Sequence, residues 1–243
     1  SRLAFCLPGQ GVHYISMARF LYDSEPVFRE VVDAVHTQAM ETFQFDLIGH
    51  IYGDEDDAQI AKNLGTLVGA QTSLYAIEVA LARLLISRNI VPDVLIGHSF
   101  GEISALTIAG VWSVADGYKA VIGRIRAAET IREAAGPQLA MASIVCTDEQ
   151  RDALLKVAGD NVVLTNINAP GRFIFGGVKA DIVRCVELAE SFGVDAQLLP
   201  IGSAFHSKYM EPAREPFRKW IRKIPCSAPT IPIMSTITGD YVK

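Results

Sequence analysis

Apolar runs and stretches with helical spacing alternate along the first half of the chain. An apolar run at residues 2–7 ends at the loop Pro8-Gly9-Gln10-Gly11, and a second run at residues 93–97 ends at a glycine, so both predict buried strands. Apolar positions at helical spacing predict helices over residues 26–40, 69–87, 102–109 and 113–135. Strands and helices in this order predict a larger α/β body.

The order of predicted strands and helices changes after the glycine and proline at residues 136–137. The pattern predicts strands over residues 139–146, 161–165, 172–176 and 194–199, and helices over residues 147–157 and 179–192. This β-α-β-β-α-β order is that of a small ferredoxin-like α+β subdomain, residues 138–199. The larger subdomain then comprises residues 1–137 and 200–243, with a predicted helix at 208–223 and a short strand within 229–238.

Composition is that of a globular protein with a sizeable core, because 50% of the 243 residues are hydrophobic and 20% are charged. A net charge of −5 gives no electrostatic basis for binding nucleic acid. The first residues do not form a signal peptide, and no apolar run approaches the ~20 residues of a membrane span. The cysteines lack metal or redox spacing, which predicts buried free thiols in a reducing cytoplasm: Cys6, Cys146, Cys185 and Cys226.

A candidate nucleophile lies in the pentapeptide Gly97-His98-Ser99-Phe100-Gly101. It separates a predicted strand from a predicted helix, which is the context of a nucleophile elbow. Glycines flank Ser99 because a tight, strained turn leaves no room for side chains there. The helix that follows would offer free N–H groups to a developing oxyanion. The alternative is an ordinary strand-to-helix turn.

A serine nucleophile needs a base, and His206 is the favoured candidate. It lies in an irregular loop, Gly202-Ser203-Ala204-Phe205-His206-Ser207, whose small residues around an aromatic ring suit a pocket wall. His98 adjoins Ser99, but a neighbour across an elbow points elsewhere. The remaining histidines are His13, His36 and His50. No acid is an obvious third member, which favours a dyad, although His206 could also be a plain loop histidine.

Further residues of the body could contact a substrate. The loop around Gln10 follows the first strand and could present backbone N–H groups, with Gln10 and Phe100 as oxyanion donors, or it could be a plain turn. Arg124 lies in the middle of a predicted helix among apolar residues. It could bind a carboxylate, or it could extend its side chain to solvent.

These motifs occur together, in one order, over nearly the whole chain. They comprise Pro8-Gly9-Gln10-Gly11, Tyr14, Met17, the run at residues 21–28, Gln71, Gly97-His98-Ser99-Phe100-Gly101-Glu102, Arg124, Asn168-Ala169-Pro170, Ala204-Phe205-His206-Ser207 and Ser235-Thr236-Ile237-Thr238-Gly239. The set resembles the malonyl-CoA:acyl-carrier-protein transacylase family and, more closely, the acyltransferase domains of polyketide synthases. The joint signal is specific where each motif is weak, and it favours the functional roles of Gln10, Arg124 and His206.

The resemblance implies a hydrolase-like parallel-sheet body with a ferredoxin-like insert, and a ping-pong transfer. Ser99, with His206 as base, would take an acyl group from coenzyme A and pass it to the phosphopantetheine thiol of an acyl carrier protein. Arg124 would pair with the free carboxylate of a dicarboxylic acyl group. Gln10 and Phe100 would supply the oxyanion hole. No bound prosthetic group or metal is implied.

The resemblance also implies a substrate pocket, formed by Gln71, His98, Asn168, Ser203 and Phe205. The sequence Ser203-Ala204-Phe205-His206 is closer to the His-Ala-Phe-His of malonyl enzymes than to the Tyr-Ala-Ser-His of methylmalonyl enzymes. Phe205 would fill the space that an α-methyl group needs, and Phe100 indicates the same preference. Ser203 departs from the malonyl pattern and leaves extra room or a polar contact.

Malonyl-CoA, an acyl carrier protein and other domains of a multidomain synthase are the implied partners, in the cytoplasm. Family members continue for some tens of residues past the Thr-Gly near Thr238-Gly239, so a C-terminal segment that helps orient the histidine is expected to be missing. The start in a strand suggests a domain of a longer polypeptide. The alternatives are a serine hydrolase that edits acyl groups from carriers, a simple esterase, a fatty-acid synthase malonyl transacylase, or a non-enzymatic docking remnant.

Overall fold

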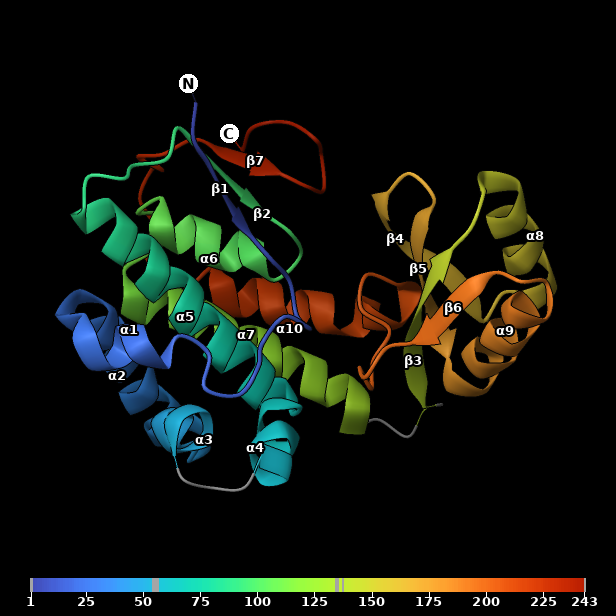
Figure 1. Ribbon diagram of the computed structural model, residues 1–243, viewed down its shortest axis with the longest axis horizontal. Helices are drawn as coiled ribbons and strands as arrows, with labels where there is room; N and C mark the ends of the chain where they lie inside the picture. Colours follow the sequence, from blue (N-terminus) through green and yellow to red (C-terminus); the bar gives the residue numbers. More distant parts are fainter. Residues whose placement is uncertain (1, 54–56, 134–135, 137, 243) are drawn as a thin grey trace. The chain divides into compact units, whose positions relative to one another are not determined.

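The computed structural model describes residues 2–53, 57–133, 136 and 138–242. The chain divides into two compact units, one of Ser1–Ile125 with Lys219–Lys243 and one of Arg126–Arg218. The first unit holds a parallel sheet and the second an antiparallel sheet (Figure 1), which confirms the predicted α/β class.

The parallel sheet of the first unit positions the candidate nucleophile. Its strands are β1 (Ala4–Leu7), β2 (Val94–Gly97) and β7 (Ile233–Ser235), in the order β1-β2-β7. The register pairs Leu7 with Gly97 and Gly97 with Ser235, so the three strands end level with one another. The segments that follow them therefore meet at one edge of the sheet.

Seven helices before residue 134 of the described chain lie wholly or partly in the first unit. They are α1 (Arg19–Ser24), α2 (Pro26–Phe43), α3 (Leu47–Tyr52), α4 (Asp57–Leu64), α5 (Leu67–Ser87), α6 (Gly101–Ile108) and α7 (Val114–Glu133), which continues into the second unit. The sequence of α5 is apolar or small on nearly every side, and the helix is accordingly buried over most of its length. It packs on α2 and α6, and α6 packs on the sheet (Figure 1).

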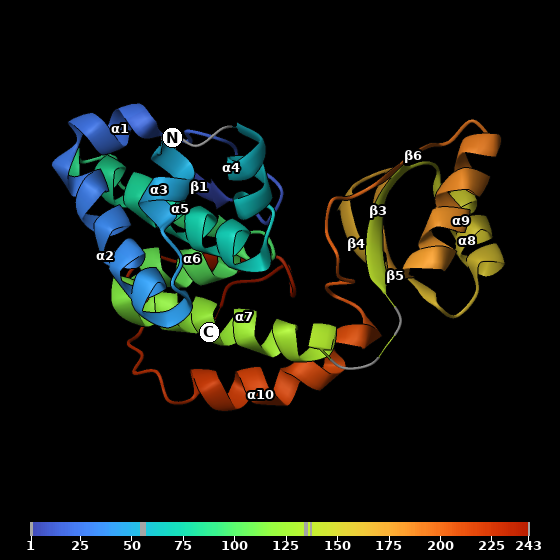
Figure 2. The same ribbon diagram turned by 90° about the horizontal axis from the view of Figure 1, so that it is seen from below.

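The second unit is built on a four-stranded antiparallel sheet. Its strands are β3 (Leu139–Val145), β4 (Val162–Ala169), β5 (Arg172–Val178) and β6 (Asp195–Leu198), in the order β4-β5-β3-β6. The helices α8 (Asp148–Ala158) and α9 (Lys179–Ser191) lie on the same face of this sheet (Figure 2) and enclose a separate apolar core. Thr147 and Gln150 form a capping box at the start of α8.

Several boundaries differ from the sequence-based expectations. The helix expected at 208–223 is a 3-10 turn, η1 (Lys208–Met210), followed by α10 (Glu211–Ile221). The strand expected within 229–238 is only the three residues of β7, since prolines before it lack the N–H that a ladder needs. The predicted end of the long helix at 134–135 lies outside the described residues.

Cys6 and Cys226 are exposed, which corrects the expectation that all four thiols are buried.

Short helices at the α1, α3 and α4 positions were not predicted. The N-terminus of α3 is capped by Asp46, whose side chain accepts a hydrogen bond from the Gly49 amide at 2.8 Å. Each of these helices is only six to eight residues long, so its apolar periodicity spans about two turns. Such a span is too short to separate a helix from a turn by pattern alone.

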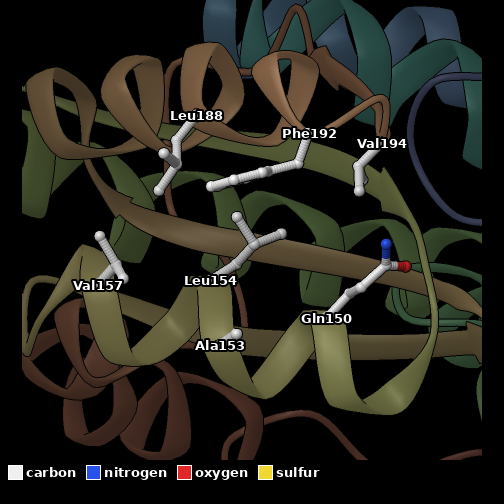
Figure 3. Close-up of a pocket in the computed structure, with 7 residues that line it drawn as sticks. All are labelled: Gln150, Ala153, Leu154, Val157, Leu188, Phe192 and Val194. Atoms are coloured by element: carbon white, nitrogen blue, oxygen red, sulfur yellow. The ribbon is translucent and has the colours of Figure 1, made fainter.

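A groove of about 400 Å³ opens between α8 and α9 (Figure 3). Its lining residues are Gln150, Ala153, Leu154, Val157, Leu188, Phe192 and Val194. None of the predicted site residues lines it.

Among the described helices, none by itself has the length and apolar character to cross a membrane, whereas α4 and α5 pass that test as a pair bent by 90°.

Candidate active site

Ser99 occupies a tight turn between β2 and α6. Its φ of 54° lies in the left-handed region, which is rare for a residue other than glycine and indicates local strain. A Cβ on Gly101 would collide with the Leu7 carbonyl, and a Cβ on Gly97 would collide with the backbone of Glu102. Both flanking glycines are therefore required for the close approach of strand and helix, as expected for a nucleophile elbow.

The loop after β1 lies directly against this elbow. A Cβ on Gly9 would stand 3.4 Å from the Ser99 Cβ and 3.2 Å from the His98 carbonyl oxygen. Gln10 follows in the same loop, and Phe100 is the N-cap residue of α6 with its side chain fully buried. Backbone N–H groups at such positions can stabilise an oxyanion that forms beside the serine. Phe100 follows Ser99 directly, and Gln10 follows the residue whose Cβ position lies 3.4 Å from the Ser99 Cβ.

A polar cluster extends from this loop to α7. The Gln71 Nε2 donates to the Gln10 Oε1 at 3.1 Å, and the Arg124 Nη1 donates to the same oxygen at 3.5 Å. The Arg124 guanidinium lies 5.6 Å from the centroid of the Phe100 ring. Five of the residues predicted from separate parts of the sequence therefore form one cluster within the first unit: Gln10, Gln71, Ser99, Phe100 and Arg124.

The side chain of Arg124 is partly buried. Burial lowers the pKa of Arg124 to about 10, so that it remains protonated near neutral pH. A desolvated cation attracts an anion far more strongly than an exposed one, because the local dielectric is low. This environment favours carboxylate binding by Arg124 over a side chain that extends to solvent.

His98 is exposed, and its backbone N–H donates to the Leu7 carbonyl at 2.8 Å.

The remaining predicted residues belong to the second unit. His206 has a φ of 60° and is exposed at the tip of its loop, whereas the preceding Phe205 is buried. The Ser203 hydroxyl donates to the Met210 Sδ at 3.6 Å, so it already has a partner within the loop. Asn168 lies apart from this loop, at a bulge in the exposed end of β4. Ser203, Phe205 and His206 thus share one loop, and Asn168 does not.

Four polar residues near the elbow or in the core of the first unit have no role predicted from the sequence. Glu102 accepts hydrogen bonds from Ser235, at the end of β7, and from Thr236, which follows it. Glu78 is buried in α5 although it is an acid. The sequence did mark these residues, since Glu102 and Ser235-Thr236 belong to the motifs quoted above and Glu78 interrupts an apolar helix face.

Within the described residues, no group of three or more acids, histidines or cysteines is placed to hold a metal ion.

Residues 4–243 match the family described as the acyl transferase domain. The phenolphthiocerol synthesis polyketide synthase type I Pks15/1 of Mycobacterium marinum is 33% identical over 239 residues, which are 98% of this chain and 11% of that protein. The malonyl CoA-acyl carrier protein transacylase of Bacillus subtilis is 30% identical over 251 residues, which cover 100% of this chain and 74% of that protein.

A solved structure of an acyltransferase domain has the same fold as this chain. The acyltransferase domain from the second module of the salinomycin polyketide synthase superposes with a TM-score of 0.82 at 32% identity, and the match covers 100% of this chain and 54% of that one. The chain spans only a small share of the polyketide synthase relative, and about three quarters of the transacylase. Family match, sequence identity and fold agree: this chain belongs to the acyl transferase domain family.

Proposed function

We propose that this chain transfers a malonyl group from coenzyme A to the phosphopantetheine thiol of an acyl carrier protein, in polyketide biosynthesis. The observation that carries the proposal is the partly buried Arg124 guanidinium, joined through Gln10 to the loop that lies against Ser99. A partly buried cation that contacts the loop against a strained serine suits a substrate with a reactive thioester at one end and a carboxylate at the other.

The transfer proceeds through an ester of Ser99. The Ser99 hydroxyl gives its proton to His206 and attacks the thioester carbonyl, while the N–H groups of Gln10 and Phe100 stabilise the oxyanion. Coenzyme A leaves as its thiol with that proton. In the second half, His206 takes the proton of the phosphopantetheine thiol, the sulfur attacks the acyl-serine, and the Ser99 hydroxyl is restored. Family membership and the order of the two residues in the chain support this dyad.

The finer description of the fold belongs to the same proposal. We infer a hydrolase-like body of residues 1–137 and 200–243 with a ferredoxin-like insert of residues 138–199; residues 126–137 and 200–218, which connect the two, fall in the second compact unit. The order β3-α8-β4-β5-α9-β6 and the placement of both helices on one face of the sheet support the insert.

Incubation with malonyl-CoA is expected to add one malonyl group to Ser99. Mass spectrometry of the intact protein and of its peptides measures the adduct, and Ser99→Ala is expected to carry none. Addition of a phosphopantetheine-bearing carrier protein is expected to move the label to the carrier thiol. Release of the malonyl group to water instead of the thiol would show an editing hydrolase, and a protein that never acquires the label would contradict the transferase.

Malonyl-CoA is expected to acylate Ser99 about tenfold faster than methylmalonyl-CoA when the two compete. Phe205 is buried in its loop, and the extra methyl group would have to displace its ring, at a cost of about 1–3 kcal/mol. Ser203 adds little, since its hydroxyl already contacts Met210. The measurement is the ratio of the two adducts in one reaction. Phe205→Ser is expected to reduce the ratio, and a wild-type preference for methylmalonyl would refute the assignment.

A further inference from the structure

The carboxylate of Glu102 links the start of α6 to the end of β7. Its Oε1 accepts a hydrogen bond from the Ser235 hydroxyl at 3.0 Å and from the Thr236 backbone N–H at 3.1 Å. Ser235 is buried, and its oxygen accepts in turn from the Ile237 N–H at 3.1 Å. Hydrogen bonds to a charged acceptor are about twice as strong as neutral ones, so this junction is well held.

The same junction reaches the strand that leads into the elbow. The Thr236 hydroxyl donates to the Gly97 carbonyl at 3.1 Å, and its contact with Glu102 is longer, at 3.4 Å. On the other side of the turn, the Glu102 N–H donates to the Ser99 carbonyl at 3.2 Å. Both ends of the turn that carries Ser99 are therefore bonded to the segment after β7.

These two attachments can hold the strained backbone conformation of the Ser99 turn. Ser99 is held at a positive φ, a strained conformation that persists only where the surroundings enforce it. The glycines permit the turn but do not hold it, because they add flexibility rather than contacts. The Glu102–Ser235–Thr236 cluster supplies contacts that fix the distance between the end of β2 and the start of α6.

We propose that Glu102 is a positioning residue for the nucleophile, and that it acts with Ser235 and Thr236 by holding the Ser99 turn against the end of β7. The inference deepens the proposed function, since it rests on Ser99 as the nucleophile. The carboxylate acts here as a hydrogen-bond acceptor and not as a charge. A negative charge in the first turn of α6 opposes oxyanion stabilisation by the positive end of the helix, so its charge alone gives no catalytic benefit.

The test compares Glu102→Ala, Glu102→Gln and Thr236→Val with the wild type. The exposed Glu41→Ala on α2 is the control for loss of an acid elsewhere. Malonyl-CoA acylation gives kcat and KM, a fluorophosphonate probe reports the reactivity of Ser99 without any acyl-CoA, and thermal unfolding reports the folded fraction. Misplacement of a reacting group by about 1 Å costs about 10²-fold in rate.

Glu102→Ala is expected to lower kcat and the fluorophosphonate rate about 10- to 100-fold with KM nearly unchanged, at a temperature where the variant is folded. Glu102→Gln is expected to recover most of the rate, since the amide oxygen can accept the same bonds. Thr236→Val loses the hydroxyl bond to Gly97 and the longer hydroxyl contact with Glu102, but keeps the backbone bond to Glu102. Its rate should fall between those of Glu102→Ala and Glu102→Gln, and it provides the test if Glu102→Ala does not fold. Glu41→Ala should match the wild type.

The proposal is overturned if Glu102→Ala and Thr236→Val keep wild-type rates, if the lost rate equals the lost folded fraction, or if Glu102→Gln is as slow as Glu102→Ala. A protein whose Ser99 reacts with the fluorophosphonate but not with malonyl-CoA would contradict the proposed function alone. The fluorophosphonate rates of the variants would still decide the role of Glu102.

Discussion

Replacement of Arg124 by alanine is expected to slow malonyl loading of Ser99 about 10²- to 10³-fold and to change acetyl loading little. The guanidinium is partly buried, and burial lowers the pKa of Arg124 to about 10, so a carboxylate bound there faces less competition from water than at an exposed arginine. Removal of one partner from a buried, hydrogen-bonded charge pair costs about 2–5 kcal/mol, and each 1.4 kcal/mol corresponds to a factor of ten. An acetyl group has no carboxylate and therefore loses nothing.

Single-turnover acylation with malonyl-CoA and acetyl-CoA, followed by mass spectrometry, measures both effects in one protein. Arg126→Ala is the matched control, because Arg126 lies two residues further along α7 with an exposed side chain. Its loading rates are expected to equal those of the wild type for both substrates. If Arg124→Ala slows acetyl and malonyl loading equally, Arg124 supports the packing around Phe100 instead of binding the carboxylate.

The candidate nucleophile was predictable because its signal is local. Gly97 and Gly101 flank Ser99 within five residues, and the apolar run before them and the helix after them fix the turn between strand and helix. The same reasoning gave the α/β class and most of the longer helices. Arg124 was ambiguous at that level, because a pattern of apolar neighbours does not say whether the guanidinium is desolvated. The contact of Arg124 with Gln10 supports a place in the site, and it joins residues 114 positions apart.

The attachment of Glu102 to Ser235 could not be predicted for the same physical reason. The two residues are 133 positions apart and meet because β2 and β7 are neighbours in a parallel sheet. Parallel neighbours can be joined by any length of intervening chain, so sequence spacing carries no information about the pair. The motifs around both residues marked them as notable, and the register of Gly97 with Ser235 gives the reason.

Replacement of Glu78 by glutamine is expected to make the protein more stable above neutral pH. Glu78 lies in α5 with 7% of its surface exposed, and neither carboxylate oxygen has a hydrogen-bond partner of good geometry. Burial raises the pKa of Glu78 to about 8, while the nearby Ser104 hydroxyl on α6 lowers it slightly. Ser104 is also buried without a well-formed partner, so it compensates little for the loss of water.

The sign of the pH dependence follows from this raised pKa. An acid whose pKa is higher in the folded state than in the unfolded chain favours folding most below the unfolded value, about 4.5. That contribution is lost progressively as the pH rises from about 4.5 to about 8, because the unfolded chain ionises over this range while the folded state keeps Glu78 protonated. The difference in pKa corresponds to about 3–5 kcal/mol between pH 4.5 and pH 9.

Urea unfolding at pH 5, 7 and 9 measures this contribution directly. The free energy of unfolding of Glu78→Gln is expected to lie close to that of the wild type at pH 5 and to exceed it by several kcal/mol at pH 9. Glu30→Gln, an exposed site on α2, controls for the removal of one acid and should follow the wild type at every pH. If the difference between Glu78→Gln and the wild type does not grow with pH, Glu78 does not carry a buried proton.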